Sequence, residues 1–435
     1  MEKVSKKITG EIKISPATFT LIEKEVKNIS EWGKKIKEFL TKRVTEALEI
    51  ILGGALLLEA SDVHIEPKEN QTRLRARIDG FLQDVTTFDL ETYQRLLSRI
   101  KLLSGIKLNI TDRPQDGRFS VLINKASIEI RVSTLPAEYG ESIVLRVLNP
   151  KTLIELENLG LRKGLLEILK KEIKRPNGMI IVTGPTGSGK TTTLYALLKK
   201  IQKPEIKIIT IEDPIEYHLK GISQTQVSPE KGYDFASGLK SIMRQDPDVI
   251  LVGEIRDLET VKTALQAALT GHLVLTTLHT NDAAGTVARL TSLGAKVINI
   301  GPAINTAIAQ RLIRKICKKC GKLEKISAQN LEKIKKTLKG LPKEIKIPKL
   351  NRELKIPKAV GCKDCNFIGY RGRIGIFETF LVDEEMEKFI LENPSISALR
   401  KMAVKKGMLT IRQDGLIKVL EGITTIEEVE RITGE

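Results

Sequence analysis

The sequence predicts an α/β fold in which a parallel sheet follows a smaller α+β domain. From residue 179 onward, short apolar strands alternate with helical stretches, and a glycine-rich loop separates the first strand from its helix. Continuous apolar strands of this kind imply a parallel sheet that is covered on both faces. Earlier segments alternate apolar and polar residues, which is typical of a half-buried sheet.

Length and charge narrow the class of protein. The 435 residues are enough for two or three domains, and no run of eighteen apolar residues occurs. The charged N-terminus lacks the apolar core of a secretory signal, so we expect a cytoplasmic protein. The net charge is +18, and residues 311–360 hold 17 Lys and Arg against four Glu and no Asp, a net +13. This segment indicates a contact face for an acidic partner or anionic lipid, or else a solvated lysine-rich surface.

The elements divide the chain into six parts. Alternation over 72–85, 127–136 and 141–149 predicts strands of the α+β domain, and apolar runs at 179–184, 206–213, 248–254 and 273–279 predict strands of the parallel sheet. We expect a short N-terminal segment (1–44), an α+β domain (45–149), a linker (150–160), a domain with the parallel sheet (161–310), a cysteine-bearing subdomain with the basic insert (311–375) and a C-terminal helical region (376–435).

A phosphate-binding loop follows the first strand of the parallel sheet. The sequence "GPTGSGKT" fits the pattern G-x-x-x-x-G-K-[ST] and opens the helix "TTTLYALLKKI". Its glycines let successive N–H groups face phosphates, Lys190 is expected at the β- and γ-phosphates, and the Thr191 hydroxyl at Mg²⁺. No N-K-x-D guanine motif follows, which favours ATP. The expected nucleotide-binding residues are Gly184, Pro185, Thr186, Gly187, Ser188, Gly189, Lys190, Thr191 and Thr192.

Acidic residues follow two neighbouring strands of the predicted sheet. Glu212 and Asp213 end one strand and Glu254 ends another, at the edge where parallel sheets bind ligands. Hydrolysis needs one group to hold Mg²⁺ and its waters and one to orient the attacking water. Gly253 stands where an Asp is usual, so either Glu254 serves alone or the other two assist. The alternative is that Asp213 only caps a following helix.

Two of the four histidines, His272 and His279, flank the fourth strand, "LVLTTLH". We expect them beside the phosphate loop, where they would sense the γ-phosphate. The alternative is that each is a hydrogen-bonded polar residue without a catalytic role.

Four segments resemble, in order, the Walker A, Asp box, Walker B and His box motifs of the type II secretion and type IV pilus assembly ATPases. They read "GPTGSGKTTTLYALL", "ITIEDPIEY", "RQDPDVILVGEIRD" and "TGHLVLTTLHTNDA". The segments "ASDVHIEP", "RARIDG", "DGRF" and "RVSTLPAEYGESIVLRVL" resemble the second N-terminal domain of that family, and residues 413–435 resemble its C-terminal end. The resemblance covers about 45–435 apart from the lysine-rich insert.

This resemblance implies a hexameric motor with a RecA-like P-loop domain after a small PAS-like α+β domain. It implies that Glu212 orients water, that Glu254 binds Mg²⁺ and that His272 and His279 act in a relay; Gly253 belongs to the family's own motif. Arg131 and Arg146 match arginines that the N-terminal domain sends to the phosphates, with Arg113 and Arg118 as lesser candidates; the alternative is that they are exposed strand arginines.

The resemblance also implies partners and a place in the cell. A homohexamer would work at the inner membrane with a platform protein there, peripherally associated from the cytoplasm. The family's first N-terminal domain, which docks to a membrane-anchored protein, would be absent or reduced to residues 1–40, so the basic segment 311–360 gains importance as a contact for the anionic membrane. We do not expect nucleic acid as a partner.

All four cysteines stand in two C-x-x-C pairs, "CKKC" and "CKDC", separated by 41 residues. In a cytosolic chain this pattern predicts a structural zinc site with four sulfur ligands, and reduced thiols without metal are the alternative. The ligands would be Cys317, Cys320, Cys362 and Cys365. The pilus assembly and secretion branch of the family carries this element, whereas retraction motors lack it.

Two other function classes remain open. A basic RecA-like ring could instead move nucleic acid, although only 4% of the residues are aromatic and no stacking array accompanies the basic segment. A scaffold without catalysis, or a pilus retraction ATPase, is also compatible with parts of the pattern. The main expectation is an ATP hydrolase that drives assembly of a pilus or pseudopilus, or type II secretion.

Overall fold

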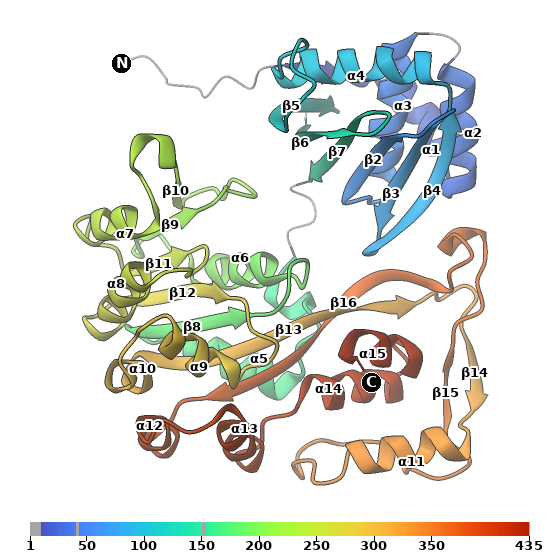
Figure 1. Ribbon diagram of the computed structural model, residues 1–435. Helices are drawn as coiled ribbons and strands as arrows, with labels where there is room; N and C mark the ends of the chain where they lie inside the picture. The colour runs from blue at the N-terminus through green and yellow to red at the C-terminus, as the bar shows by residue number, and fades with distance from the viewer. Residues whose placement is uncertain (1–9, 41–42, 125, 150–153, 435) are drawn as a thin grey trace. The chain divides into compact units, whose positions relative to one another are not determined.

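The computed structural model describes residues 10–40, 43–124, 126–149 and 154–434, and it divides into two compact units (Figure 1). The first unit holds the chain up to Thr152 together with Cys317–Gly321 and Ala359–Arg371, and the second holds the remainder. Within the described ranges, none of the helices has the length and apolar character needed to cross a membrane.

The first unit is a seven-stranded sheet with four helices. Its strand order is β1-β5-β6-β7-β2-β3-β4, antiparallel except where β1 runs parallel to β5. The elements are β1 (Glu11–Lys13), α1 (Pro16–Glu25), α2 (Ile29–Leu40), α3 (Val44–Leu57), β2 (Asp62–Pro67), β3 (Thr72–Ile78), β4 (Phe81–Phe88), α4 (Leu90–Ser104), β5 (Gln115–Ile123), β6 (Ala126–Ala137) and β7 (Gly140–Leu148).

Alternation along the strands gives this sheet one buried face. Buried and half-buried residues alternate without exception along β3, as period-two geometry requires. Trp32 of α2 is fully buried and donates its indole N–H to the carbonyl of Ile50 in α3 (3.1 Å). A side chain at Gly54 of α3 would meet the Trp32 ring at 2.1 Å, so only glycine allows these two helices to pack so closely.

The second unit is built on a seven-stranded sheet in the order β10-β9-β11-β12-β8-β13-β16. The pairs from β10 to β13 are parallel. Its elements up to the last parallel strand are η2 (Leu156–Asn158), α5 (Lys163–Glu172), β8 (Gly178–Thr183), α6 (Lys190–Ile201), β9 (Ile208–Glu212), β10 (Ser223–Gln226), η3 (Pro229–Lys231), α7 (Phe235–Met243), β11 (Val249–Val252), α8 (Leu258–Leu269), β12 (Leu273–Leu278), α9 (Gly285–Ser292), α10 (Val297–Ala303) and β13 (Ile304–Ile316).

Two apolar cores cover the two faces of this sheet. Alternate residues of each strand enter one core with α7 and α8, and the intervening residues enter the other with α5 and α6. Every residue of β8, β11 and β12 is therefore buried, which explains why these strands contain only apolar residues, glycine and threonine. The predicted α/β class and the four predicted parallel strands are confirmed.

The remaining elements of the second unit pack beyond the sheet. The basic insert forms a two-stranded antiparallel sheet and a helix between its strands, and Leu331 and Ile334 of this helix are buried with residues of two C-terminal helices. The elements are β14 (Lys322–Lys325), α11 (Ala328–Thr337), β15 (Lys355–Lys358), η4 (Lys363–Cys365, in the first unit), β16 (Tyr370–Leu381), α12 (Glu384–Leu391), α13 (Ile396–Lys405), α14 (Ile411–Leu420) and α15 (Ile426–Thr433). The predicted C-terminal helices are therefore present.

The two units differ from the expected divisions in two places. The described part of segment 1–44 is not separate, because α1 and α2 share one core with the strands that follow. The expected subdomain 311–375 is split: the cysteine turns belong to the first unit, where Asn366 accepts the backbone N–H of Ile29 at the start of α2 (2.8 Å), while 322–358 belongs to the second. Residues 150–153 of the expected linker lie outside the described residues, and its described part, from Ile154, includes the short helix η2.

Candidate functional site

The phosphate loop joins β8 to α6 at the carboxyl edge of the parallel sheet. Gly184, Gly187 and Gly189 all have positive φ angles, of 150°, 78° and 87°. Gly189 caps the helix in the left-handed conformation, and a side chain at Gly184 would meet the carbonyl of Gln310 at 2.6 Å. The loop therefore needs glycines at these points, and its backbone leads directly into the positive end of α6.

Polar side chains of the loop and of the first turn of α6 are available to a phosphate. The ammonium of Lys190 donates to the carbonyls of Gly184 (2.9 Å) and Pro185 (3.3 Å). Burial lowers the pKa of Lys190, and the nearby carboxylate of Glu254 acts in the opposite direction. The Ser188 hydroxyl is buried and has no hydrogen-bond partner within the described residues. A buried unpaired hydroxyl beside a lysine fits a phosphate group.

The two predicted carboxylates follow neighbouring strands. Glu212 ends β9, and Glu254 follows β11 after Gly253, whose N–H donates to the carbonyl of Ile211 (2.8 Å). A side chain at Gly253 would lie 3.3 Å from the Cα of Glu212, so this glycine lets the strand ends approach. Asp213 is exposed, and no helix begins in the described loop 213–222, so the helix-capping alternative is wrong.

Glu254 is the centre of a charged cluster. One carboxylate oxygen lies 3.3 Å from Nε2 of His279, which follows β12, and the other lies 2.5 Å from the guanidinium of Arg256. The Glu254 side chain is 13% exposed, whereas His279 is half exposed. The structure thus brings Lys190, Glu254 and His279 together at one edge of the sheet.

His272 does not join this cluster, which corrects the expectation that both histidines lie beside the phosphate loop. It precedes β12, and its carbonyl accepts the N–H of Gly178 at the start of the parallel strand β8. Its ring nitrogen Nδ1 lies 3.2 Å from the carbonyl of Ala267 at the end of α8. Because β8 and β12 run parallel, His272 lies at the amino edge and the phosphate loop at the carboxyl edge.

Two cations near the loop were not predicted. Arg256 holds Glu254, as described above, and Arg311 of β13 donates to the carbonyls of Asn281 (2.8 Å) and Gln310 (3.1 Å). Burial lowers the pKa of Arg311, and its charge helps to lower the pKa of Lys190. The sequence offers no local signal for Arg311, because it comes from a strand about 120 residues beyond the loop that pairs with β8 only in the folded sheet.

The predicted arginines lie in a row in the first unit. Arg118, Arg131 and Arg146 are direct neighbours across β5, β6 and β7, and Arg146 is opposite Asp62 of β2. The Arg146 guanidinium binds Asp62 at 2.9 Å, while Arg131 lies 3.5 Å from Glu129. Arg113 is exposed and precedes β5. Side chains opposite one another point to the same face, so the row concentrates positive charge there.

The four cysteines converge on one point of the first unit. Their sulfur atoms all lie within 4.8 Å of one another. Three of the separations are 3.9 Å (Cys317–Cys362), 3.7 Å (Cys320–Cys365) and 3.8 Å (Cys362–Cys365). Four thiolates at about 2.3 Å around a tetrahedral ion are about 3.8 Å apart, so the cluster fits a metal ion.

Backbone donors complete the surroundings of this cluster. The N–H groups of Gly361 and Gly369 point to Sγ of Cys320 and Cys365, each at 3.3 Å, and the N–H of Cys362 lies 3.1 Å from Sγ of Cys365. Such bonds stabilise thiolates and orient the ligands of a metal site. Four protein ligands leave no open position, so the cluster fits a structural metal ion.

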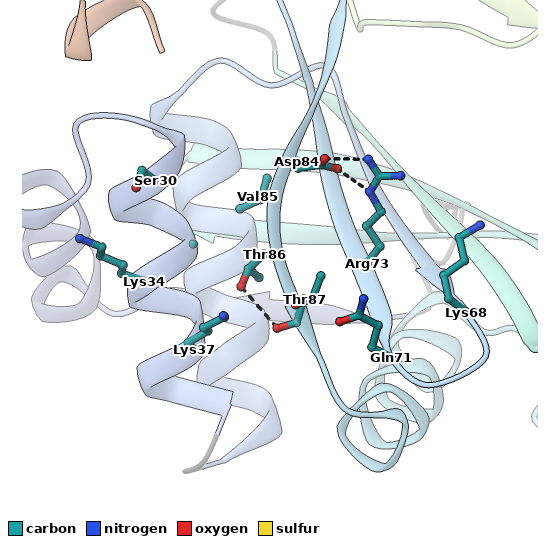
Figure 2. Close-up of a pocket in the computed structure, with 11 residues that line it drawn as sticks. Ser30, Lys34, Lys37, Lys68, Gln71, Arg73, Asp84, Val85, Thr86 and Thr87 are labelled. Carbon is teal, nitrogen blue, oxygen red and sulfur yellow. Dashed lines mark hydrogen bonds and ion pairs between the residues drawn. The ribbon is translucent and has the colours of Figure 1, made fainter. Parts of the chain in front are cut away.

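A pocket of ≈ 610 Å³ in the first unit lies between α2 and the hairpin β3–β4 (Figure 2). Figure 2 shows the amines of Lys34 and Lys68 on opposite sides of the pocket, pointing away from one another. The guanidinium of Arg73 is held by two bonds of 2.6 Å to Asp84. Because its cations are dispersed or already paired, this pocket does not gather charge around a single ligand.

Comparisons with known proteins agree with the motifs. The chain is 42% identical over 380 residues to the type IV pilus assembly ATPase PilB of Thermus thermophilus, a match that covers 87% of this chain but only 42% of that protein. It is 43% identical over 395 residues to the type II secretion system ATPase E of Vibrio cholerae, covering 90% of this chain and 76% of that one. This chain therefore spans less than half the length of the former and about three quarters of the latter.

A solved structure and a family model extend the agreement. The crystal structure of the pilus retraction motor PilT with bound ADP superposes with a TM-score of 0.59 at 28% identity, covering 88% of this chain and 95% of that one. The family model described as "Type II/IV secretion system protein" matches residues 39–431. The chain therefore belongs to the Type II/IV secretion system protein family.

Proposed function

We propose that the chain is an ATPase that converts ATP hydrolysis into movement between its two units and so drives type IV pilus or pseudopilus assembly, or type II secretion. The observation that carries this proposal is the cluster of Lys190, Glu254 and His279 at the phosphate loop. Relatives of about 40% identity are named as ATPases of these two machines.

We assign one role in the proposed reaction to each residue of the site. Lys190 and the N–H groups of the loop bind the β- and γ-phosphates, and Thr191 and Glu254 hold Mg²⁺ and its waters. When bound, Mg²⁺ would neutralise phosphate charge. Glu212 orients the attacking water, and His279 holds Glu254 in place.

The arginine row would complete the site from the first unit. Arg131 and Arg146 would contact the phosphates when the units close, adding positive charge where negative charge develops. Loss of the γ-phosphate would weaken this contact and release the closed state. A homohexamer coupled to an inner-membrane platform protein would transmit the movement, as the family assignment supports.

We also propose that the cysteine cluster holds zinc and that the lysine-rich insert contacts anionic membrane. The sulfur spacing supports zinc, because the tetrahedral four-sulfur set is the one that structural zinc prefers. The apolar face of α11 is buried within its own unit, and its lysines and those of β14 and β15 lie on the outer side. Lys325, Lys333, Lys335 and Lys358 are paired with glutamates, so Lys322, Lys336 and Lys355 would be the ones to meet lipid headgroups.

Phosphate release by the purified chain tests the hydrolytic proposal. Lys190→Ala should abolish ATP binding, whereas Lys199→Ala, on the same helix but exposed and paired with Glu155, should not. Vesicles with anionic lipid should stimulate turnover, and DNA should not. Wild-type turnover by Lys190→Ala would refute the site, and stimulation by DNA alone would favour a nucleic-acid motor.

A further inference from the structure

The carboxylate of Glu212 is enclosed by three side-chain donors. The Tyr195 hydroxyl binds one of its oxygens, and Thr210 Oγ1 (2.6 Å) and Gln224 Nε2 (3.1 Å) bind the other. Glu212 is 4% exposed, Tyr195 2% and Thr210 not at all.

Sheet geometry explains why the three donors meet. Thr210 and Glu212 are two residues apart on β9, so they share one face of the strand. Gln224 is opposite Thr210 in the parallel pairing of β10 with β9 and therefore points to that same face. The third donor, Tyr195, reaches this face from α6, which covers it.

We infer that Tyr195 is a positioning residue that fixes the carboxylate of Glu212 relative to the nucleotide. This inference rests on the proposed role of Glu212 in orienting water. Tyr195 stands four residues after Thr191, so the two side chains occupy one face of α6, one turn apart. One helix thus carries both the expected Mg²⁺ ligand and the group that holds the water-orienting carboxylate.

The protonation state and the orientation of the Tyr195 hydroxyl both suit donation to the Glu212 carboxylate. Burial raises the pKa of Tyr195 far above its ordinary value, and the negative charge of Glu212 acts in the same direction. The hydroxyl therefore stays protonated and donates to the carboxylate. The Tyr217 ring makes an edge contact with the Tyr195 ring, with 6.3 Å between centroids, which fixes the direction of the donor.

Gln224 extends the arrangement to the loop after β9. Its Nε2 also donates to the carbonyl of Tyr217 (3.0 Å), and its Oε1 accepts the N–H of Leu219 (2.6 Å). The same amide therefore ties the carboxylate and the loop 213–222 together. A displacement of that loop would shift Glu212, so the loop and helix α6 jointly set its position.

Tyr195→Phe tests the inference, because it removes one hydroxyl and keeps the buried ring. We expect kcat to fall about ten- to hundredfold, as for loss of a bond to a charged group, with the KM for ATP unchanged. Tyr233→Phe is the matched control: its hydroxyl binds Thr225 on β10 (3.0 Å), away from Glu212, and turnover should stay at the wild-type rate.

A double-mutant cycle separates positioning from general damage to the fold. If Tyr195 acts through Glu212, Tyr195→Phe should cause no further loss of kcat in a Glu212→Gln background. An equal further loss there, or wild-type kcat in Tyr195→Phe alone, would overturn the inference. Wild-type turnover by Glu212→Gln alone would instead refute the proposed role of Glu212, whatever Tyr195→Phe does.

Discussion

Glu254 and His279 face one another across the ends of β11 and β12, with 3.3 Å between Oε2 and Nε2. The opposite side of the carboxylate is held by Arg256. A carboxylate bound on both sides keeps one orientation, which is what a ligand of Mg²⁺ requires. This pair joins two strand ends of the sheet beside the phosphate loop.

Removal of the imidazole should loosen Glu254. We expect His279→Ala to lower kcat about tenfold, because the carboxylate keeps only Arg256 as a partner. Phosphate release at saturating ATP and Mg²⁺ measures the effect. His272→Ala, which changes the histidine at the opposite edge of the sheet, should retain the wild-type rate. Equal rates for all three proteins would show that His279 has no part in the reaction.

The arginine row should be required for turnover. We expect Arg131→Ala and Arg146→Ala each to lower kcat at least about tenfold, since each removes a positive charge proposed to meet the phosphates. Arg73→Ala is the control within the same unit, because Arg73 lies on β3, outside the arginine row. The fluorescence of Trp32, the only tryptophan, checks that the unit remains folded. Wild-type kcat in both variants would remove these arginines from the site.

A buried ion pair should govern the stability of the first unit. The ammonium of Lys101 lies 2.5 Å from Glu141, and both side chains are at most 3% exposed. Lys101→Met leaves a buried carboxylate without its partner and should cost about 3–5 kcal/mol of unfolding free energy. Urea titration followed by Trp32 fluorescence measures it, and Lys101→Met with Glu141→Gln should recover much of the loss. A loss of less than about 1 kcal/mol of unfolding free energy in Lys101→Met would contradict the importance of this ion pair.

Loss of the metal should weaken the contact between the cysteine turns and α2. Cys365→Ser is expected to reduce bound zinc from one ion per chain to none, as measured by atomic absorption. It should also lower the urea midpoint reported by Trp32, because Asn366 follows Cys365 and binds the start of α2. Asn366→Gly keeps the left-handed conformation (φ 51°) and should lose only this contact while retaining zinc. A wild-type chain purified without any bound metal would contradict the zinc assignment.

The local features of the site could be predicted because neighbouring residues determine them. The phosphate loop requires its glycines and lysine within eight positions, and the four strands around it can be recognised from short, mostly apolar segments. The dipeptide Asp79-Gly80 is likewise typical of a turn, and both residues have positive φ. The family resemblance read from four ordered motifs is confirmed by the family model.

Long-range features could not be predicted, because they depend on pairing between distant segments. Strands β13 and β16 add to the sheet of the second unit, and β13 places Arg311 near Lys190. The cysteine turns pack with the first unit although the sequence between them packs with the second. The position of His272 could have been predicted from the sequence, because a residue that precedes a strand of a parallel sheet lies at the amino edge of that sheet.

The partners of Glu212 show the same limit. The spacing of Thr191 and Tyr195 can be read from the sequence as one helical face, and that of Thr210 and Glu212 as one strand face. The contact between these two faces depends on tertiary structure, because it arises from the packing of α6 on β9 and β10. The position of Glu212 at a strand end could therefore be predicted from the sequence, but the residues that hold its carboxylate could not.

Phosphate release by Glu212→Gln is the most direct measurement of the central claim, that this site hydrolyses ATP with Glu212 orienting the water. The amide keeps the shape of the side chain and removes its charge. We predict ATP binding within about threefold of wild type, followed by fluorescence of a labelled nucleotide, and phosphate release at least about 100-fold slower. Phosphate release at the wild-type rate, with ATP still bound, would contradict the account.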